Sequence, residues 1–193
     1  MHRILKNYKN KVFIVAEIGN NHEGNFEIAK KLIKKAAECK VDAVKFQTFE
    51  PNLFYAKSEK KKLKKLKKFF LSIDQFKKLS YIAKKNNLVF FSTPLDLNSA
   101  KKLNKFQKIF KIASSDNNYL DLIDLVSKFK KDLIISTGFS DLKLLNKIYK
   151  LVNKNWKKLK NKPSLAFTHC VSSYPTRFEE SNIFTIKELK KKI

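Results

Sequence analysis

Residues 41–50, VDAVKFQTFE, contain the pattern that decides the fold, namely a short apolar run followed by polar residues. A run this short, rich in Val and Phe, is typical of a strand that is buried on both faces. Five other stretches share the design: KVFIVAEIGNNHEG (11–24), LVFFSTPLD (88–96), KIFKIASSD (108–116), DLIISTG (132–138) and SLAFTHCVSSYPT (164–176). The chain is therefore expected to contain a series of buried strands, each with a polar cluster where it ends.

Amphipathic stretches separate most of these runs and predict helices. Strands are expected at residues 12–16, 43–46, 88–91, 109–112, 133–136 and 165–168. Helices are expected at residues 25–39, 74–86, 98–104, 119–129 and 142–152, and from about 183 onward, with Asp74 as the N-cap of the second. This alternation predicts an α/β fold with a parallel sheet and right-handed crossovers.

Polar residues at the same end of successive parallel strands converge on one mouth, where a β/α-barrel has its active site. The chain has 193 residues and can bury one sizeable core, so a single domain, 1–193, is expected. A complete eight-fold barrel typically needs about 250 residues. The pattern therefore predicts an incomplete TIM-type (β/α)8 barrel with about six βα units, from which strands 7 and 8 are missing.

The formal net charge of +26 raises the question of nucleic-acid binding. The only arginines are Arg3 and Arg177, and the lysines are spread along every expected helix, whereas nucleic-acid readers favour Arg. We therefore expect a solvated lysine surface that attracts anionic substrates, and no nucleic-acid partner.

The cysteines and the hydropathy also exclude several classes of protein. Cys39 and Cys170 lie far apart and form no CxxC pair, so neither a disulfide framework nor a Cys-based zinc site is expected. No stretch approaches the roughly 20 apolar residues of a membrane span. A cytoplasmic protein is expected.

Residues 52–73 interrupt the strand–helix rhythm with a strongly basic segment at 57–70. Its leucines and phenylalanines are spaced for one helical face, so it could lie on a membrane surface or an acidic partner. It could equally be an extra helix over a long loop, and this second interpretation is preferred because inserted loops are common on the functional side of a barrel.

Several strand residues point to an anion site. Lys45 and Gln47 alternate with apolar neighbours, so both are expected to face the barrel interior, where a lysine must pair with a carboxylate or bind an anion. Glu17 follows the run VFIVA and could serve either as that carboxylate or as an acid, base or substrate anchor. Lys111 repeats the pattern of Lys45, and hydroxyl groups accompany these lysines on Thr93, Ser114 and Ser136. Ammonium groups and hydroxyls together favour a phosphate or carboxylate ligand.

Two histidines and a tyrosine remain open. His169 follows the strand at 165–168, but no partner at metal-ligand spacing accompanies it, so a structural role is favoured. His22 lies in the loop GNNHEG, where a turn role and a catalytic role are equally compatible with the sequence. Tyr174 could contact substrate at the rim or simply pack.

Together, AEIGNNHEG, DAVKFQTF, FFSTPLD, KIASSD, STG and HCVSSYPT resemble the sialic acid synthase family, which includes legionaminate, pseudaminate and spore-coat polysaccharide relatives. The resemblance implies a TIM barrel that condenses phosphoenolpyruvate with N-acetylmannosamine or a related N-acetylated amino sugar. It implies a nonulosonic acid and phosphate as products, and a divalent metal, usually Mn²⁺, as Lewis acid.

The resemblance also assigns roles to residues. It implies phosphoenolpyruvate binding by five of them: Lys45, Thr93, Lys111, Ser114 and Ser136. It places Glu17 near the reacting centre, and it places Gln47 and Tyr174 at the acceptor sugar. Ser172 falls where some members carry Asn, which bears on sugar preference.

Other family features are not recognisable in this sequence. The metal-binding histidine segments and the small antifreeze-like C-terminal domain have no counterpart here, and full-length relatives form homodimers that exchange that domain. The polypeptide is therefore expected to be inactive by itself. A non-enzymatic remnant or a Lys-rich binding protein that keeps an anion pocket is the alternative.

Overall fold

The computed structural model describes residues 4–5, 11–56 and 58–192. The chain forms two compact units, Met1–Phe110 and Lys111–Ile193, and each is described by itself. Two basic residues considered above, Arg3 and Lys57, lie outside the described residues.

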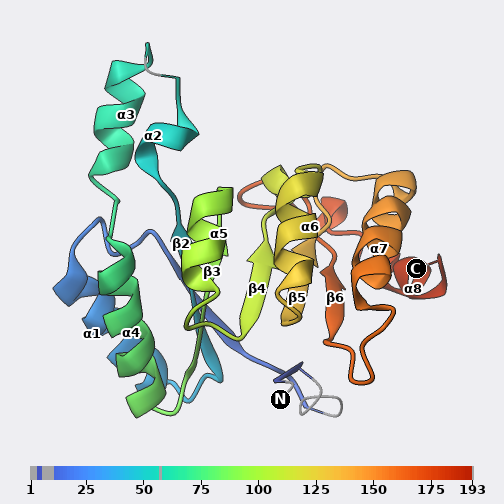
Figure 1. Cartoon of the computed structure of the whole chain (residues 1–193), viewed down its shortest axis with the longest axis horizontal. Helices are drawn as coiled ribbons and strands as arrows, with labels where there is room; N and C mark the ends of the chain where they lie inside the picture. The colour runs from blue at the N-terminus through green and yellow to red at the C-terminus, as the bar shows by residue number, and fades with distance from the viewer. Residues whose placement is uncertain (1–3, 6–10, 57, 193) are drawn as a thin grey trace. The chain divides into compact units, whose positions relative to one another are not determined.

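Strands and helices alternate along the chain, as the apolar runs predict (Figure 1). The strands are β1 Val15–Gly19, β2 Ala43–Thr48, β3 Val89–Pro94, β4 Ile109–Ile112, β5 Asp132–Ser136 and β6 Leu165–Thr168. The helices are α1 Phe26–Glu38, α2 Pro51–Phe54, α3 Lys60–Lys67, α4 Ile73–Lys85, α5 Leu97–Leu103, α6 Leu120–Lys128, α7 Leu142–Trp156 and α8 Thr185–Lys192.

The strands form two three-stranded sheets, in the orders β1-β2-β3 and β4-β5-β6. In the first sheet, β2 pairs in parallel with both neighbours, and β5 pairs in parallel with β6 in the second. The expectation of an α/β fold with parallel pairing is confirmed. An incomplete barrel stays a prediction.

The core of the first unit lies between its sheet and two helices. α1 and α4 pack side by side on one face of the sheet (Figure 1). Ala29, Ile33 and Ala36 of α1 are buried at the three- and four-residue spacing of one helical face. Val44 and Phe46 of β2 are fully buried on the same face of the strand, toward this core, and Lys45 on the other face is only 9% exposed, so β2 is covered on both sides.

Two local predictions in this unit are wrong. The first strand begins at Val15 rather than at residue 12, because Val12 is 80% exposed and no layer covers it. Consequently Glu17 lies within β1 instead of after it. The N-cap of α4 is Ser72 rather than Asp74, since the Ser72 hydroxyl accepts from Gln75 N–H while the Gln75 side chain accepts from Ser72 N–H. Two reciprocal hydrogen bonds satisfy more of the helix end than one Asp could.

In the second unit, α6 and α7 pack against each other. α7 runs to Trp156, four residues beyond its expected end, because the Trp156 ring is buried and its Nε1–H donates to the Ser127 carbonyl at 2.8 Å. A buried indole needs such an acceptor, so this bond fixes the last turn of α7.

The basic segment at 57–70 forms one short helix, α3, which confirms the extra helix in this loop, and a second short helix, α2, precedes it. None of the described helices is both long and apolar enough to cross a membrane.

Candidate functional site

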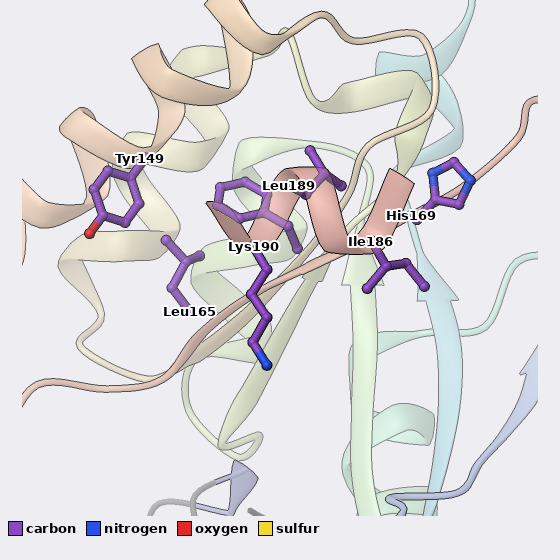
Figure 2. Close-up of a pocket in the computed structure, with 7 residues that line it drawn as sticks. Tyr149, Leu165, His169, Ile186, Leu189 and Lys190 are labelled. Atoms are coloured by element: carbon purple, nitrogen blue, oxygen red, sulfur yellow. The ribbon is translucent and has the colours of Figure 1, made fainter. Parts of the chain in front are cut away.

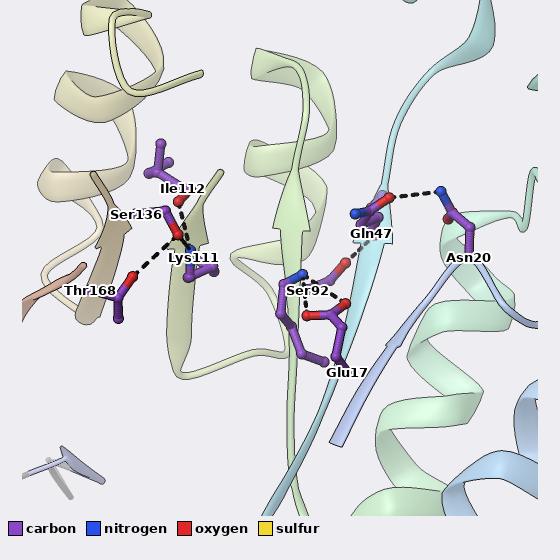
Figure 3. A network of polar contacts seen from close by, with 10 residues as sticks. Glu17, Asn20, Gln47, Ser92, Lys111, Ile112, Ser136 and Thr168 are labelled. Carbon is purple, nitrogen blue, oxygen red and sulfur yellow. Dashed lines mark hydrogen bonds and ion pairs between the residues drawn. The ribbon is translucent and has the colours of Figure 1, made fainter. Parts of the chain in front are cut away.

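The first cluster lies in the first unit and is centred on Lys45. Lys45 of β2 stands opposite Glu17 of β1 in the parallel register. Its Nζ donates to both carboxylate oxygens of Glu17, at 2.9 and 2.8 Å (Figure 3). Lys45 is only 9% exposed, whereas the Glu17 side chain is 57% exposed. The ion pair therefore has one desolvated cationic end and one wet anionic end.

Polar groups on the following positions surround this ion pair. Gln47 lies two residues after Lys45, and its Oε1 accepts a hydrogen bond of 2.7 Å from Asn20 Nδ2 (Figure 3). Thr93 pairs with Gln47 in register from β3 and is buried. Within the part of the chain that the structure describes, the Thr93 hydroxyl has no hydrogen-bond partner. A buried hydroxyl of this kind can donate to a ligand, and leaving it unpaired costs about 1–3 kcal/mol.

The second cluster lies in the second unit and is centred on Lys111 of β4. Its Nζ donates to the Ser136 hydroxyl at the end of β5 and to the Ile112 carbonyl (Figure 3). The Ser136 hydroxyl also shares a hydrogen bond of 3.2 Å with Thr168 Oγ1, at the end of β6. Three neighbouring strands thus bring an ammonium group and two hydroxyls together.

Two more hydroxyls approach the loop that follows β5. The Gly138 N–H donates to Ser114 Oγ at 3.2 Å. A Cβ at position 138 would lie 2.6 Å from Ser172 Oγ and 2.7 Å from Ser114 Oγ, so any larger residue there would have to displace these serine side chains. Asn117 is buried, and its Nδ2 donates to the carbonyls of Ser136 and Gly138, at 3.2 and 2.6 Å. Asn117 therefore holds the loop in place beside the hydroxyls.

The second cluster changes the acidity of Cys170. Burial raises the pKa of this thiol, but hydrogen bonds from Ser136, Thr168 and the Thr137 backbone, with the charge of Lys111, outweigh it and lower the pKa overall. Hydrogen-bond donors and a positive charge favour the charged form of a thiol, which is the direction of this shift.

The chain matches the NeuB family model over residues 32–193. It belongs to the NeuB family. The N,N'-diacetyllegionaminic acid synthase of Campylobacter jejuni is 36% identical over 194 residues, which are 93% of this chain and 57% of that protein. The chain spans about half the length of the curated relatives that it matches.

Solved structures agree with this assignment. The N-acetylneuraminic acid synthetase of Leptospira borgpetersenii, solved in complex with citrate, superposes with a TM-score of 0.87 and 29% identity, covering 95% of this chain and 62% of that one. A phospho-2-dehydro-3-deoxyheptonate aldolase of Thermotoga maritima superposes with a TM-score of 0.68 at 11% identity, over 95% of this chain and 49% of that one. This second likeness concerns the fold alone.

The described residues do not fit a metal. No group of three or more His, Cys, Asp or Glu side chains gathers in residues 4–5, 11–56 or 58–192. His169 Nε2 instead lies 2.8 Å from the Ser181 carbonyl, at the edge of a cavity of about 320 Å³ lined mainly by apolar residues of β6, α7 and α8 (Figure 2). We assign no metal-dependent step to these residues.

Tyr174 and His22, which the sequence left open, differ sharply in exposure. The Tyr174 side chain is 99% exposed. His22 is fully buried between Phe46 and Phe76, and its Nδ1 accepts from Gly24 N–H at 3.0 Å, which is the turn role. Burial lowers the pKa of His22.

The sequence interpretation missed four members of the second cluster: Asn117, Gly138, Thr168 and Cys170. Gly138 lies in the motif STG, Cys170 lies in HCVSSYPT, and Thr168 ends the apolar run just before it. No local sequence pattern marks these residues, because most of their contacts join segments about 20–35 residues apart that only the strand register brings together.

Proposed function

We propose that this chain is a synthase polypeptide of the NeuB family that condenses phosphoenolpyruvate with N-acetylmannosamine or a related N-acetylated sugar. The observation that carries the proposal is the position of Lys111 among the hydroxyls of Ser136 and Thr168, at one end of three neighbouring strands. Family membership adds relatives whose names describe synthases of acidic sugars.

In this proposal the second cluster binds the phosphate or carboxylate of phosphoenolpyruvate. The Lys111 ammonium donates charge-assisted hydrogen bonds, which are the strong ones for such groups. The hydroxyls of Ser114 and Ser136 now bond groups within the cluster, and in this proposal they rotate to bond the ligand instead. The Gly138 N–H, now bonded to Ser114, becomes available when Ser114 turns. The bound anion thus replaces hydrogen bonds that the cluster already makes.

The first cluster is proposed to serve the reacting centre and the sugar. The family resemblance proposes Lys45 and Thr93 as donors for phosphoenolpyruvate, and Glu17 would act as acid or base while it neutralises Lys45. In this unit, Gln47 is proposed from the family resemblance as a contact of the acceptor sugar. For the second unit, taken by itself, the same resemblance proposes this role for Ser172 and Tyr174.

The proposed reaction balances with one water molecule. C3 of phosphoenolpyruvate forms a bond to the aldehyde carbon of the open-chain sugar, and the aldehyde oxygen gains a proton. The water oxygen adds to C2, the bond between C2 and the phosphate oxygen breaks, and inorganic phosphate leaves. The described residues bring no three metal-ligating side chains together, so Mn²⁺ as Lewis acid would need ligands that they do not supply, and we propose that the isolated polypeptide is inactive for this reason. A cytoplasmic location and a homodimer are further parts of the proposal.

Binding and turnover are measured separately to test this proposal. Isothermal titration calorimetry of the chain with phosphoenolpyruvate comes first, beside Lys111→Ala and the matched control Lys147→Ala, which removes an exposed lysine of α7. We expect Lys111→Ala to weaken binding at least about tenfold, because one charge-assisted hydrogen bond contributes roughly 1.5–3 kcal/mol. Equal binding by the two variants would overturn the role of the second cluster.

Turnover is measured as phosphate release with phosphoenolpyruvate, N-acetylmannosamine and Mn²⁺. Phosphate release that requires the sugar and disappears in Lys111→Ala would support a synthase. It would contradict the proposal that the isolated polypeptide is inactive. Binding that depends on Lys111 without release from any N-acetylated sugar supports the alternative, a protein that keeps only an anion pocket.

A further inference from the structure

The helix α3 differs from the packed helices of this chain because none of its residues is buried. It follows the short helix α2, and the two contact each other beyond the end of β2 (Figure 1). We call residues 51–56 and 58–70 the α2–α3 hairpin. Seven exposed lysines gather on it: Lys60, Lys61, Lys62, Lys64, Lys65, Lys67 and Lys68. Over the described part of the chain, the one ion pair made by these lysines joins Lys62 to Glu59, at 3.0 Å.

Large apolar side chains are exposed on the same hairpin. Leu53 is 60% exposed, Phe54 44% and Phe70 38%. The Phe54 ring is nevertheless held in place by edge contacts with Phe49 and Tyr55. Exposed single apolar residues are ordinary on a protein surface, but apolar side chains beside a dense lysine cluster form an amphipathic surface.

The hairpin is also fixed to the first unit at both ends. Pro51, where it begins, is buried, and Leu71, directly after it, is 2% exposed. Gly24 packs against its last turn so closely that a Cβ there would lie 2.0 Å from the Lys68 carbonyl oxygen. The lysines and the apolar side chains are therefore presented from an anchored base, so that less conformational entropy is lost when they bind.

We propose that the α2–α3 hairpin binds reversibly to a membrane surface that carries anionic lipids. Lysine is a point charge that suits a diffuse negative surface, and arginine, which reads bases and phosphates in a fixed geometry, is missing from the hairpin sequence. Leu53 and Phe54 would enter the boundary between headgroups and acyl chains. Acyl chains can bury an aliphatic side chain such as that of Leu53, whereas a nucleic acid has no apolar layer in which to bury it. The hairpin lies on the surface in this proposal and does not span the membrane.

A second row of exposed lysines, on α7, differs from the hairpin because it belongs to a packed helix. α7 carries Lys143, Lys147, Lys150 and Lys154 on its exposed side. The opposite side of α7 is buried through Leu145, Ile148, Val152 and Trp156. These lysines are the solvated face of a packed helix, so they provide a control with the same change in net charge.

The test is co-sedimentation of the full chain with vesicles of phosphatidylcholine, with and without phosphatidylserine. The first variant neutralises Lys61, Lys62, Lys64 and Lys65 to Gln, and the matched control neutralises the four α7 lysines. We expect binding to phosphatidylserine vesicles at low salt to fall roughly a hundredfold in the hairpin variant and less than about threefold in the control, since each lysine near an anionic surface contributes separately. Circular dichroism and thermal melting check that both variants fold.

A second variant, Leu53→Ser with Phe54→Ser, separates insertion from simple attraction. We expect it to bind roughly tenfold more weakly and to lose its remaining binding at moderate salt. Equal losses of vesicle binding in the hairpin lysine variant and the α7 lysine variant would overturn the proposal, because binding would then depend only on the net charge of the chain. Lysine-dependent binding to single-stranded DNA without binding to phosphatidylserine vesicles would overturn it in favour of a nucleic-acid surface.

Discussion

Lys45 and Lys111 are comparable lysines on strands of different units, but their surroundings differ. Lys45 donates to both oxygens of the Glu17 carboxylate, whereas the hydrogen bonds described for Lys111 go to the Ser136 hydroxyl and the Ile112 carbonyl. A carboxylate of its own unit therefore holds the Lys45 ammonium group. The described contacts of Lys111 place its ammonium group among hydroxyls, which can also donate hydrogen bonds to an anion.

The largest effect is expected when the second cluster is crowded. Gly138→Ala places a methyl group within 2.6 Å of Ser172 Oγ and 2.7 Å of Ser114 Oγ, so these serine side chains or the loop must shift. We expect phosphoenolpyruvate binding to weaken roughly 10–100-fold and stability to fall by about 1–3 kcal/mol, the usual cost of overpacking. Calorimetric titration and denaturant melting measure both.

The matched control for this change is Ser140→Ala, because the Ser140 hydroxyl bonds the Thr137 carbonyl in the same loop without reaching the two serines. Comparable loss of affinity in the two variants would mean that the loop, and not the hydroxyl cluster, determines binding.

The two ends of the first ion pair predict unequal responses. Glu17→Gln leaves the desolvated Lys45 cation without a carboxylate, while Lys45→Met leaves an exposed Glu17 that water can solvate. We expect Glu17→Gln to cost about 1–2 kcal/mol, less than for a fully buried pair because Glu17 is wet, and Lys45→Met to cost under about 1 kcal/mol. Denaturant melting of both variants measures the difference, and the reverse order would contradict the view that Lys45 is held by its own unit.

Much of the fold could be predicted because the strands are locally encoded. The strand Ile109–Ile112 lies where its apolar run predicts it, since burial on both faces leaves a continuous apolar pattern. The start of β1 could not be predicted, because Val12 has the same apolar character as Val15 and only tertiary packing leaves it exposed. The prediction of the N-cap of α4 was wrong for a similar reason. Ser72 and Asp74 are both good capping residues, and the reciprocal hydrogen bonds with Gln75 decide between them.

The candidate site divides in the same way. Lys45 and Lys111 could be selected because a charged residue inside an apolar run is costly and therefore informative. Asn117 could not, because an Asn in SSDNN is an ordinary turn residue until β5 brings the Ser136 and Gly138 carbonyls within 3.2 and 2.6 Å of its amide.

Acid should affect the two units in opposite directions. Burial lowers the pKa of His22, so the first unit contributes stability above the ordinary histidine pKa of about 6.5 and loses it as the pH falls through the lower folded-state pKa. Burial raises the pKa of Asp116 despite a hydrogen bond from Ser115, so the second unit gains stability as the pH falls through that raised value. The His22 effect is at most about 1.4 kcal/mol per pH unit, since one proton is involved. Amide hydrogen exchange between pH 7 and 5 should show protection lost in the first unit only, and His22→Gln should abolish this loss.

The smallest expected effect concerns the acidity of Cys170, which reports the electrostatic character of the second cluster without any ligand. Hydrogen bonds from Ser136 and Thr168 and the charge of Lys111 outweigh the effect of burial and lower the thiol pKa. In a Cys39→Ser background, where Cys170 is the only thiol, the pH profile of iodoacetamide alkylation should therefore have a midpoint below that of an ordinary cysteine. Lys111→Ala should move the midpoint upward, while Lys147→Ala should leave it unchanged. An unchanged midpoint in Lys111→Ala would mean that the Lys111 charge does not reach Cys170, and the second cluster would then lose the electrostatic character assigned to it.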